Sequence, residues 1–135
     1  MAAFQKFRAF VEALSEKVHN LGADQLVVAL TNTVPVNTNA ILTDITEISY
    51  TNCSSRDIST SSSAQSAGTY KLVLTDLVLT ASGSVGPFRY VVIYNGTASN
   101  DELICWFDYG SSITLATGEQ FTLDFDGTNG LFTLT

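Results

Sequence analysis

The sequence predicts a mainly β domain: an antiparallel β-sandwich or jelly-roll-like body with one N-terminal amphipathic α-helix. Up to residue 22, apolar residues recur at spacings of three and four, which is the period of a helix. Beyond residue 22, short apolar runs alternate with turn signals, a pattern typical of antiparallel strands. We expect one domain over residues 1–135, with the helix in 1–22 and the β-sandwich in 23–135.

The predicted helix has one apolar stripe. It consists of Phe4, Phe7, Val11, Leu14, Val18 and Leu21. Gly22 follows the stripe, as a C-terminal cap would. A single stripe normally faces the core of its own domain, so we expect the helix to pack on the sheet. The alternative is a helix that also reaches a neighbouring subunit.

The strands are expected where apolar runs stand between turns. These runs are QLVVALT, TDITEISYT, TYKLVLTDLVLTAS, FRYVVIYN, LICWFDYG, SSITLAT, QFTLDFD and LFTLT. The serine-rich stretch 54–68 is expected to be an exposed loop or a thin edge strand. Asp76 interrupts one run and indicates a bulge or bend.

The stretch PFRYVVIYN, residues 87–95, is apolar on both faces. Strict alternation places Phe88, Tyr90, Val92 and Tyr94 on one face, and Arg89, Val91 and Ile93 on the other. A strand of this kind is typical of the centre of a sheet that is covered on both sides. We expect the opposing sheet to cover one face and the helix to cover the other. Arg89 is expected to form a structural ion pair with Asp108 on the neighbouring strand.

Charge and composition exclude several classes of function. The net charge is −7, and no Lys or Arg follows Arg89, so a nucleic-acid surface is not expected. Glu12 and Glu16 interrupt the N-terminal apolar residues, so this segment is not predicted to be a signal peptide or a membrane segment. We therefore expect folding in the cytoplasm, with Cys53 and Cys105 as reduced thiols.

The sequence offers few groups for catalysis. His19 is the only histidine, and no serine or cysteine stands in a nucleophile-elbow pattern. One histidine and two distant cysteines do not form a zinc ligand set. The adjacent acids Asp101 and Glu102 are interpreted as solvated loop residues and not as a glycosidase pair. We predict that the chain is not an enzyme and that it uses no cofactor.

Two further motifs have both a functional and a structural interpretation. In DFDGTNG, the oxygens of Asp124, Asp126 and Asn129 could hold calcium, but Thr128 stands where a further ligand is needed, which favours a hairpin turn. The aromatic residues Tyr94, Trp106 and Tyr109 could form a sugar-binding platform. Filling of the core is the favoured interpretation, because Trp106 lies in a strand that is apolar on both faces.

Four segments carry a resemblance to a known family. KVHNLGADQLVVALTNTVPV, GTYKLVLTDLVLTAS, GPFRYVVIYN and WFDYGSSITLATGEQFTLDFDGTNG follow one another along nearly the whole chain. Together they resemble a family of small virion structural proteins of tailed bacteriophages. The resemblance implies a virion component that is made in the cytoplasm of the bacterial host, and it brings no catalytic residues.

Small β-rich phage proteins of this size commonly serve as capsid cement or decoration proteins. The resemblance therefore implies binding to the major capsid protein, to copies of the same chain, or to both, without nucleic acid, membrane or small-molecule substrate. A tail- or fibre-associated module that binds a receptor is the main alternative, and a hydrolase of cell-wall sugar is a third. The expected contact residues are Phe4, Phe7, Val11 and Leu14 of the helix, and Arg56 in the polar stretch 54–68.

Overall fold

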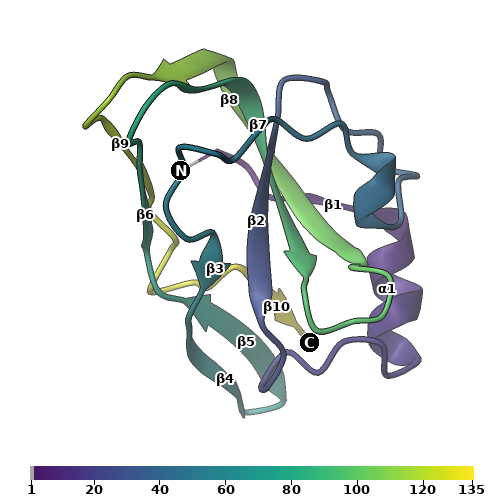
Figure 1. Ribbon diagram of the computed structural model, residues 1–135. Coiled ribbons are helices and arrows are strands. Elements are labelled where there is room, and N and C mark those ends of the chain that lie inside the picture. The colour runs from purple at the N-terminus through teal and green to yellow at the C-terminus, as the bar shows by residue number, and fades with distance from the viewer. Residues whose placement is uncertain (1) are drawn as a thin grey trace.

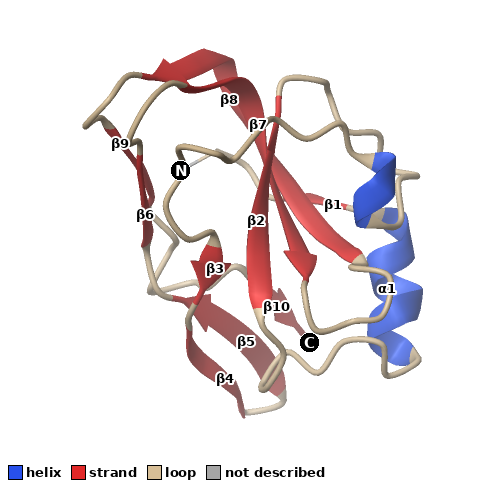
Figure 2. Cartoon of the chain, in the orientation of Figure 1, coloured by secondary structure: helices blue, strands red, loops and turns tan. Residues whose placement is uncertain are grey.

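The computed structural model describes residues 2–135, which form a mainly β, sandwich-like domain (Figures 1 and 2). This confirms the predicted fold class. The elements in chain order are β1 (Gln5–Lys6), α1 (Arg8–Ser15), β2 (Leu26–Thr31), the 3-10 helix η1 (Leu42–Asp44), β3 (Asp57–Ile58), β4 (Thr60–Ser66), β5 (Thr69–Leu74), β6 (Leu77–Thr80), β7 (Val85–Asn95), β8 (Leu103–Leu115), β9 (Gln120–Leu123) and β10 (Phe132–Leu134).

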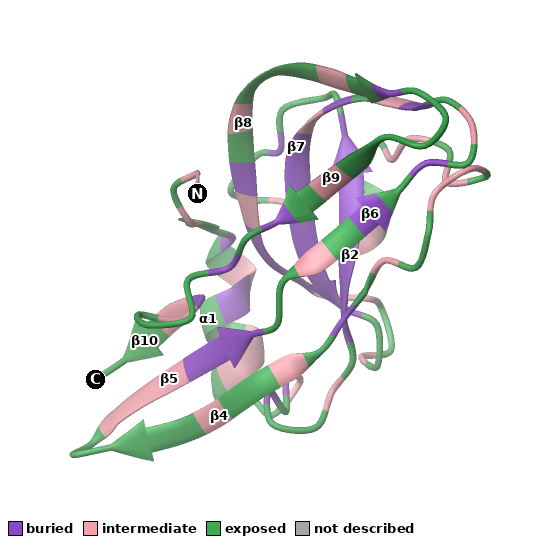
Figure 3. Cartoon of the chain, turned by 90° about the vertical axis from the view of Figure 1, so that its left-hand side faces the viewer, coloured by how far each residue is buried: buried purple, intermediate pink, exposed green. Residues whose placement is uncertain are grey.

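The strands form three antiparallel sheets. The large sheet has the order β1-β8-β7-β2-β3, and the two smaller sheets have the orders β10-β5-β4 and β6-β9. The smaller sheets lie in front of the large sheet in Figure 3, where the outer strand β4 is mostly exposed. The main core fills the space between them. Its members include Phe10, Leu26, Val28, Leu30, Leu72, Leu74, Leu79, Val91, Ile93, Phe107 and Leu123.

The other face of the large sheet has its own, smaller core. This core consists of Phe7, Val27, Ala29, Ile45, Val92, Tyr94 and Leu103, with Leu42 and Trp106 packed against it. The segment around η1 supplies the cover, and α1 does not, contrary to expectation. The run TDITEISYT is therefore not a strand. Its apolar residues divide between the two cores, since Ile45 is buried in the smaller one and Ile48 packs against the main one.

Strand β7 is the central strand that its sequence predicts. Val91 and Ile93 are fully buried on one face, and Val92 is fully buried on the other. Phe88 departs from strict alternation, because it belongs to the main core together with Val91. The reason is a change of register: Phe88 lies opposite Ile113, but Tyr90 lies opposite Asp108. Irregular pairing of this kind moves a side chain to the other face of a sheet.

The N-terminal helix is shorter than predicted, and residues 1–22 are not one helix. Gln5 and Lys6 pair with β8, and α1 begins only at Arg8. It ends at Ser15 because Lys17 has a left-handed backbone (φ 70°), and the N–H of Val18 donates to the carbonyl of Ala13. This is the Schellman form of helix termination. Gly22 lies in a later turn and does not cap the helix.

The strand pattern departs from the sequence prediction at two more places. The run TYKLVLTDLVLTAS bends at Asp76, as predicted, but it is not one strand: the bend divides it into β5 and β6, which belong to different sheets. The carboxylate of Asp76 accepts a hydrogen bond from the N–H of Phe125 (2.8 Å) and so fixes the bend. LICWFDYG and SSITLAT form one long strand, β8. In the serine-rich stretch, the thin edge strand expected at RDIST is present as the two-residue strand β3 at the edge of the large sheet, and Thr60–Ser66 form a second edge strand, β4, that was not expected.

Gly130 holds β10 against β5, and its replacement by alanine should be costly. Its φ is 78°, and an added Cβ would lie 2.5 Å from the carbonyl oxygen of Leu72. Gly118 has a similar φ of 84°, with open space around it in the described structure. Gly118→Ala should cost about 1–2 kcal/mol from backbone strain alone, and Gly130→Ala should cost clearly more. Urea unfolding of both variants tests this; equal losses would mean that the contact with Leu72 relaxes freely.

Candidate functional site

The side chain of Asn95, which is fully buried, joins the segment after α1 to the end of β7. The side-chain N–H2 of Asn95 donates to Nδ1 of His19 (3.0 Å) and to Oδ2 of Asp24 (2.7 Å). The side-chain oxygen of Asn95 accepts from the backbone N–H groups of Thr97 and Ala98. These four bonds use every donor and acceptor of the Asn95 amide, so its orientation is fixed.

His19 is held in one neutral form by this network. Its Nδ1 accepts from Asn95, so the ring proton is on Nε2, and Nε2 is buried without a hydrogen-bond partner among the described residues. Burial lowers the pKa of His19, and the carboxylates of Glu102 and Asp24 offset only part of this shift. This neutral ring, whose Nδ1 lone pair is occupied by the bond from Asn95, ties two segments together. It does not have the geometry of an activated base.

Arg56 is engaged inside the fold and does not point freely to the solvent. Its guanidinium donates to the carbonyl of Val28 and lies 3.7 Å above the ring centre of Tyr50. The Tyr50 hydroxyl accepts from the N–H of Leu30 and donates to Glu47. Burial raises the pKa of Tyr50 far above its usual range. The cluster thus fastens the segment around residue 50 to β2, a structural role.

Arg89 and Asp108 form the ion pair that the sequence predicts. The two nitrogens Nε and Nη2 of Arg89 donate to the two carboxylate oxygens of Asp108 (2.8 and 3.1 Å). Oδ1 of Asp108 also accepts from the N–H of Gly110. These bonds lower the pKa of Asp108, the Arg89 bond most strongly. The side chains are 38% and 42% exposed, so the pair lies on the surface and not in an apolar interior.

Asp126 and Asn129, two of the possible calcium ligands in DFDGTNG, are bonded to each other in a local turn. Oδ1 of Asp126 accepts from the N–H groups of Thr128 and Asn129, and its Oδ2 accepts from the Asn129 side chain. Asp124 has no hydrogen bond to either residue, and in residues 2–135 no three His, Cys, Asp or Glu side chains are grouped as metal ligands. The segment is a turn that connects β9 to β10, but not a hairpin, because these strands belong to different sheets.

The aromatic residues considered as a sugar platform are divided between the two cores. Tyr94 is buried in the smaller core, where Trp106 packs on Phe7 with ring centres 4.7 Å apart. Tyr109 packs edge-on against Phe121 in the main core. Core filling was therefore the correct interpretation. Cys53 and Cys105 are both free thiols, as expected, and burial raises the pKa of each.

A groove lies between α1 and the three-stranded sheet β10-β5-β4, and we call it the α1–β10 groove. It consists of two adjoining cavities of about 440 and 640 Å³. Leu14 and Leu134 line both cavities, which places the two cavities side by side. Phe132, Thr133 and Leu134 form one wall of the smaller cavity, and Phe10, Val11 and Leu14 form the other.

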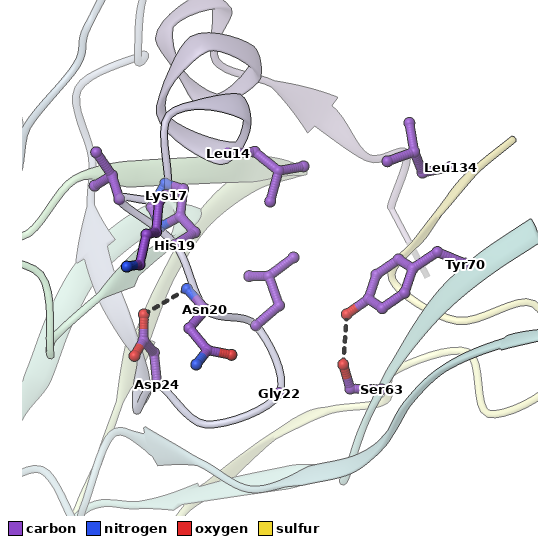
Figure 4. Close-up of a pocket in the computed structure, with 11 residues that line it drawn as sticks. Leu14, Lys17, His19, Asn20, Gly22, Asp24, Ser63, Tyr70 and Leu134 are labelled. Atoms are coloured by element: carbon purple, nitrogen blue, oxygen red, sulfur yellow. Dashed lines mark hydrogen bonds between the residues drawn. The ribbon is translucent and has the colours of Figure 1, made fainter.

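The larger cavity combines apolar and polar side chains (Figure 4). Leu14, Leu134 and the ring of Tyr70 face it from one side, and the Tyr70 hydroxyl is bonded to Ser63 (2.7 Å). On the other side lie residues 17–24, where Asp24 accepts from the backbone N–H of Asn20 (2.8 Å). The buried His19–Asn95 bond thus holds the segment that forms this wall.

The helix residues predicted to contact a partner have different environments in the structure. Val11 is 49% exposed beside the groove, and Leu14 is half-buried within it. Phe4 packs against Phe107 and Phe132. Phe7 is fully buried against Trp106 and is not part of the surface. The sequence did not indicate Leu134, which is 55% exposed, because it ends a run with ordinary strand alternation.

Comparison with known proteins found no matching family model, no matching curated protein and no matching solved structure. Within the described residues, no helix has the length and apolar character needed to cross a membrane.

Replacing Asp108 tests the surface ion pair. Asp108→Asn should lower the melting temperature by about 2 °C, because exposed pairs contribute little. Asp108→Ala should lower it further, since it also removes the acceptor for the N–H of Gly110. Asp124→Asn, which changes the charge equally at an exposed position, is the control. Equal melting temperatures for Asp108→Asn and the wild type would show that the pair does not stabilise the fold.

The network around His19 should make stability depend on pH. The unfolded chain takes up a proton near pH 6.5, but the folded His19 does so only at lower pH, because its pKa is lowered. Stability should therefore be complete above about pH 6.5 and should decrease as the pH falls toward the pKa of the folded state. Melting curves between about pH 7.5 and 5.5 measure this effect. In His19→Gln the decrease should be smaller; parallel curves would contradict the assignment.

Proposed function

We propose that this chain is a structural component of a tailed-phage virion that binds neighbouring proteins, most simply as a capsid cement or decoration protein. The observation that carries the proposal is the α1–β10 groove. It leaves Val11 and Leu134 about half exposed at its rim, although the chain has two well-filled cores elsewhere. Exposed apolar side chains beside a groove are typical of a surface that binds another protein. The resemblance of four sequence segments to small phage virion proteins supports the particular assembly.

The polar side chains considered as functional residues are engaged in bonds within the fold, which agrees with a binding role. His19, Arg56 and Asp126 each bond to groups that hold the fold together. The proposal accordingly gives the chain no catalytic activity and no cofactor. Its proposed partners are the major capsid protein, further copies of this chain, or both, in a virion whose proteins are made in the cytoplasm of the bacterial host. Repetition by particle symmetry would let a modest groove contribute many contacts.

A tail- or fibre-associated module is the second candidate, and the larger cavity favours it. Lys17, Asn20 and Ser63 lie around an apolar floor that includes Tyr70. Hydrogen-bonding groups beside an aromatic ring are suited to a sugar. Binding of purified protein on a glycan array, lost on Tyr70→Ala, would favour this candidate over the cement protein.

Quantification of the protein in purified particles tests the proposed function. A cement protein should be present in copy numbers on the order of hundreds, because it follows the capsid lattice. Particles without it should release their DNA at a lower temperature than complete particles. A copy number of a few per particle would indicate the tail, and absence from the particle would refute the proposed function. Unchanged heat resistance at high copy number would refute cementing but keep the virion location.

A further inference from the structure

The strand β10 borders the groove with its edge and not only with one face. It is the end strand of the sheet β10-β5-β4, so its outer side has no strand beside it in the described structure. Phe132, Thr133 and Leu134 all line the smaller cavity, although the side chains of successive strand residues point to opposite faces. The backbone edge therefore forms part of the wall. A free strand edge offers N–H and C=O groups to an added strand.

The helix α1 lies opposite this edge and is fixed there by aromatic contacts. Phe132 of β10 packs edge-on against Phe10 of α1, with ring centres 5.5 Å apart, and it stacks on Phe4 at 6.1 Å. These rings form the floor, and Val11 and Leu134 form the exposed rim. The space between a helix and a free strand edge admits an extended chain whose alternate side chains enter the groove.

Charge distinguishes the groove from the rest of this acidic chain. The net charge is −7, yet Lys6 lines one cavity and Lys17 lines the other. Because Leu14 and Leu134 are common to both cavities, the two lysines lie toward opposite ends of the groove. Asp24 is the acidic residue of the lining, and its Oδ2 already accepts two hydrogen bonds. The groove thus complements a segment that is acidic at its ends.

We propose that the α1–β10 groove receives an extended segment of a neighbouring protein, which adds a strand beside β10, with apolar side chains at alternate positions and acidic residues at both ends. This inference deepens the proposed function and relies on it for the presence of a neighbour. In the particle, such a segment would be an arm of an adjacent major capsid protein. The added strand would extend the sheet to the order arm-β10-β5-β4.

Peptide binding tests the inference directly. The probe is a labelled peptide of about eight residues, with leucine at alternate positions, serine between them and aspartate at each end. Its controls are the same peptide with lysine at each end, and one with proline at a central serine. Fluorescence anisotropy should show the strongest binding for the aspartate peptide. Hydrogen exchange should show slower exchange of β10 amides when it is bound. Absence of binding even at millimolar concentration would overturn the inference.

Substitutions at the rim place the peptide in the groove. Val11→Glu and Leu134→Glu should each weaken binding about tenfold, since they lose an apolar contact and repel the acidic ends. Val78→Glu is the matched control, because Val78 is 44% exposed on β6, away from the groove. Melting temperatures close to that of the wild type would show that each variant is folded. Equal weakening by Val78→Glu would overturn the inference.

Charge reversal and oligomeric state complete the test. The double variant with Lys6→Glu and Lys17→Glu should prefer the lysine-ended peptide; an unchanged preference would refute the acidic partner.

Sedimentation should show a monomer. A dimer that Leu134→Glu dissociates would show that a second copy fills the groove, and would overturn the inference. The peptide assay does not depend on the particle. If the chain binds the peptide but is absent from virions, the proposed function is refuted and the inference about the groove stands.

Discussion

Strand β7 is apolar on both faces, so the large sheet at the centre of this protein has to be covered twice. The smaller sheets cover the face that carries Val91 and Ile93 and form the main core with it. The segment around η1 and the ring of Phe7 cover the face that carries Val92. Each cover comes from a different part of the chain. The two faces of β7 therefore bring together the N-terminal segment, residues 32–50 and the C-terminal strands. The rest of the fold follows from this constraint.

The N-terminal segment shows how the double cover shapes the surface. Phe7 enters the smaller core and Phe10 enters the main core, so the chain turns around the edge of the large sheet between them. This division ends the N-terminal strand pairing at Lys6 and begins α1 at Arg8. The helix is consequently placed beside the free edge of β10, and not over the sheet face. The groove is a result of this placement, because a helix centred on the sheet would bury its own apolar stripe.

The buried polar network has a complementary part in forming the groove. Residues 16–25 contain no regular element, yet they form the wall of the larger cavity. Asn95 holds this segment by bonding both His19 and Asp24, at a cost that is small because all four of its hydrogen-bonding positions are satisfied.

The sequence by itself determined the features that depend on local pattern. The mainly β class, the central position of β7, the Arg89–Asp108 pair and the bend at Asp76 all follow from alternation, charge spacing or an interrupted run. Tertiary structure decided the conformation of the segments in which local preferences compete with one another. Residues 4–7 match a helical stripe, but Gln5 and Lys6 pair with β8 as a strand, and Ile45 is buried in the second core without being part of a strand. The groove could not be predicted, because Leu134 and Val11 are far apart in the sequence and only the packing of Phe132 against Phe10 brings their elements together.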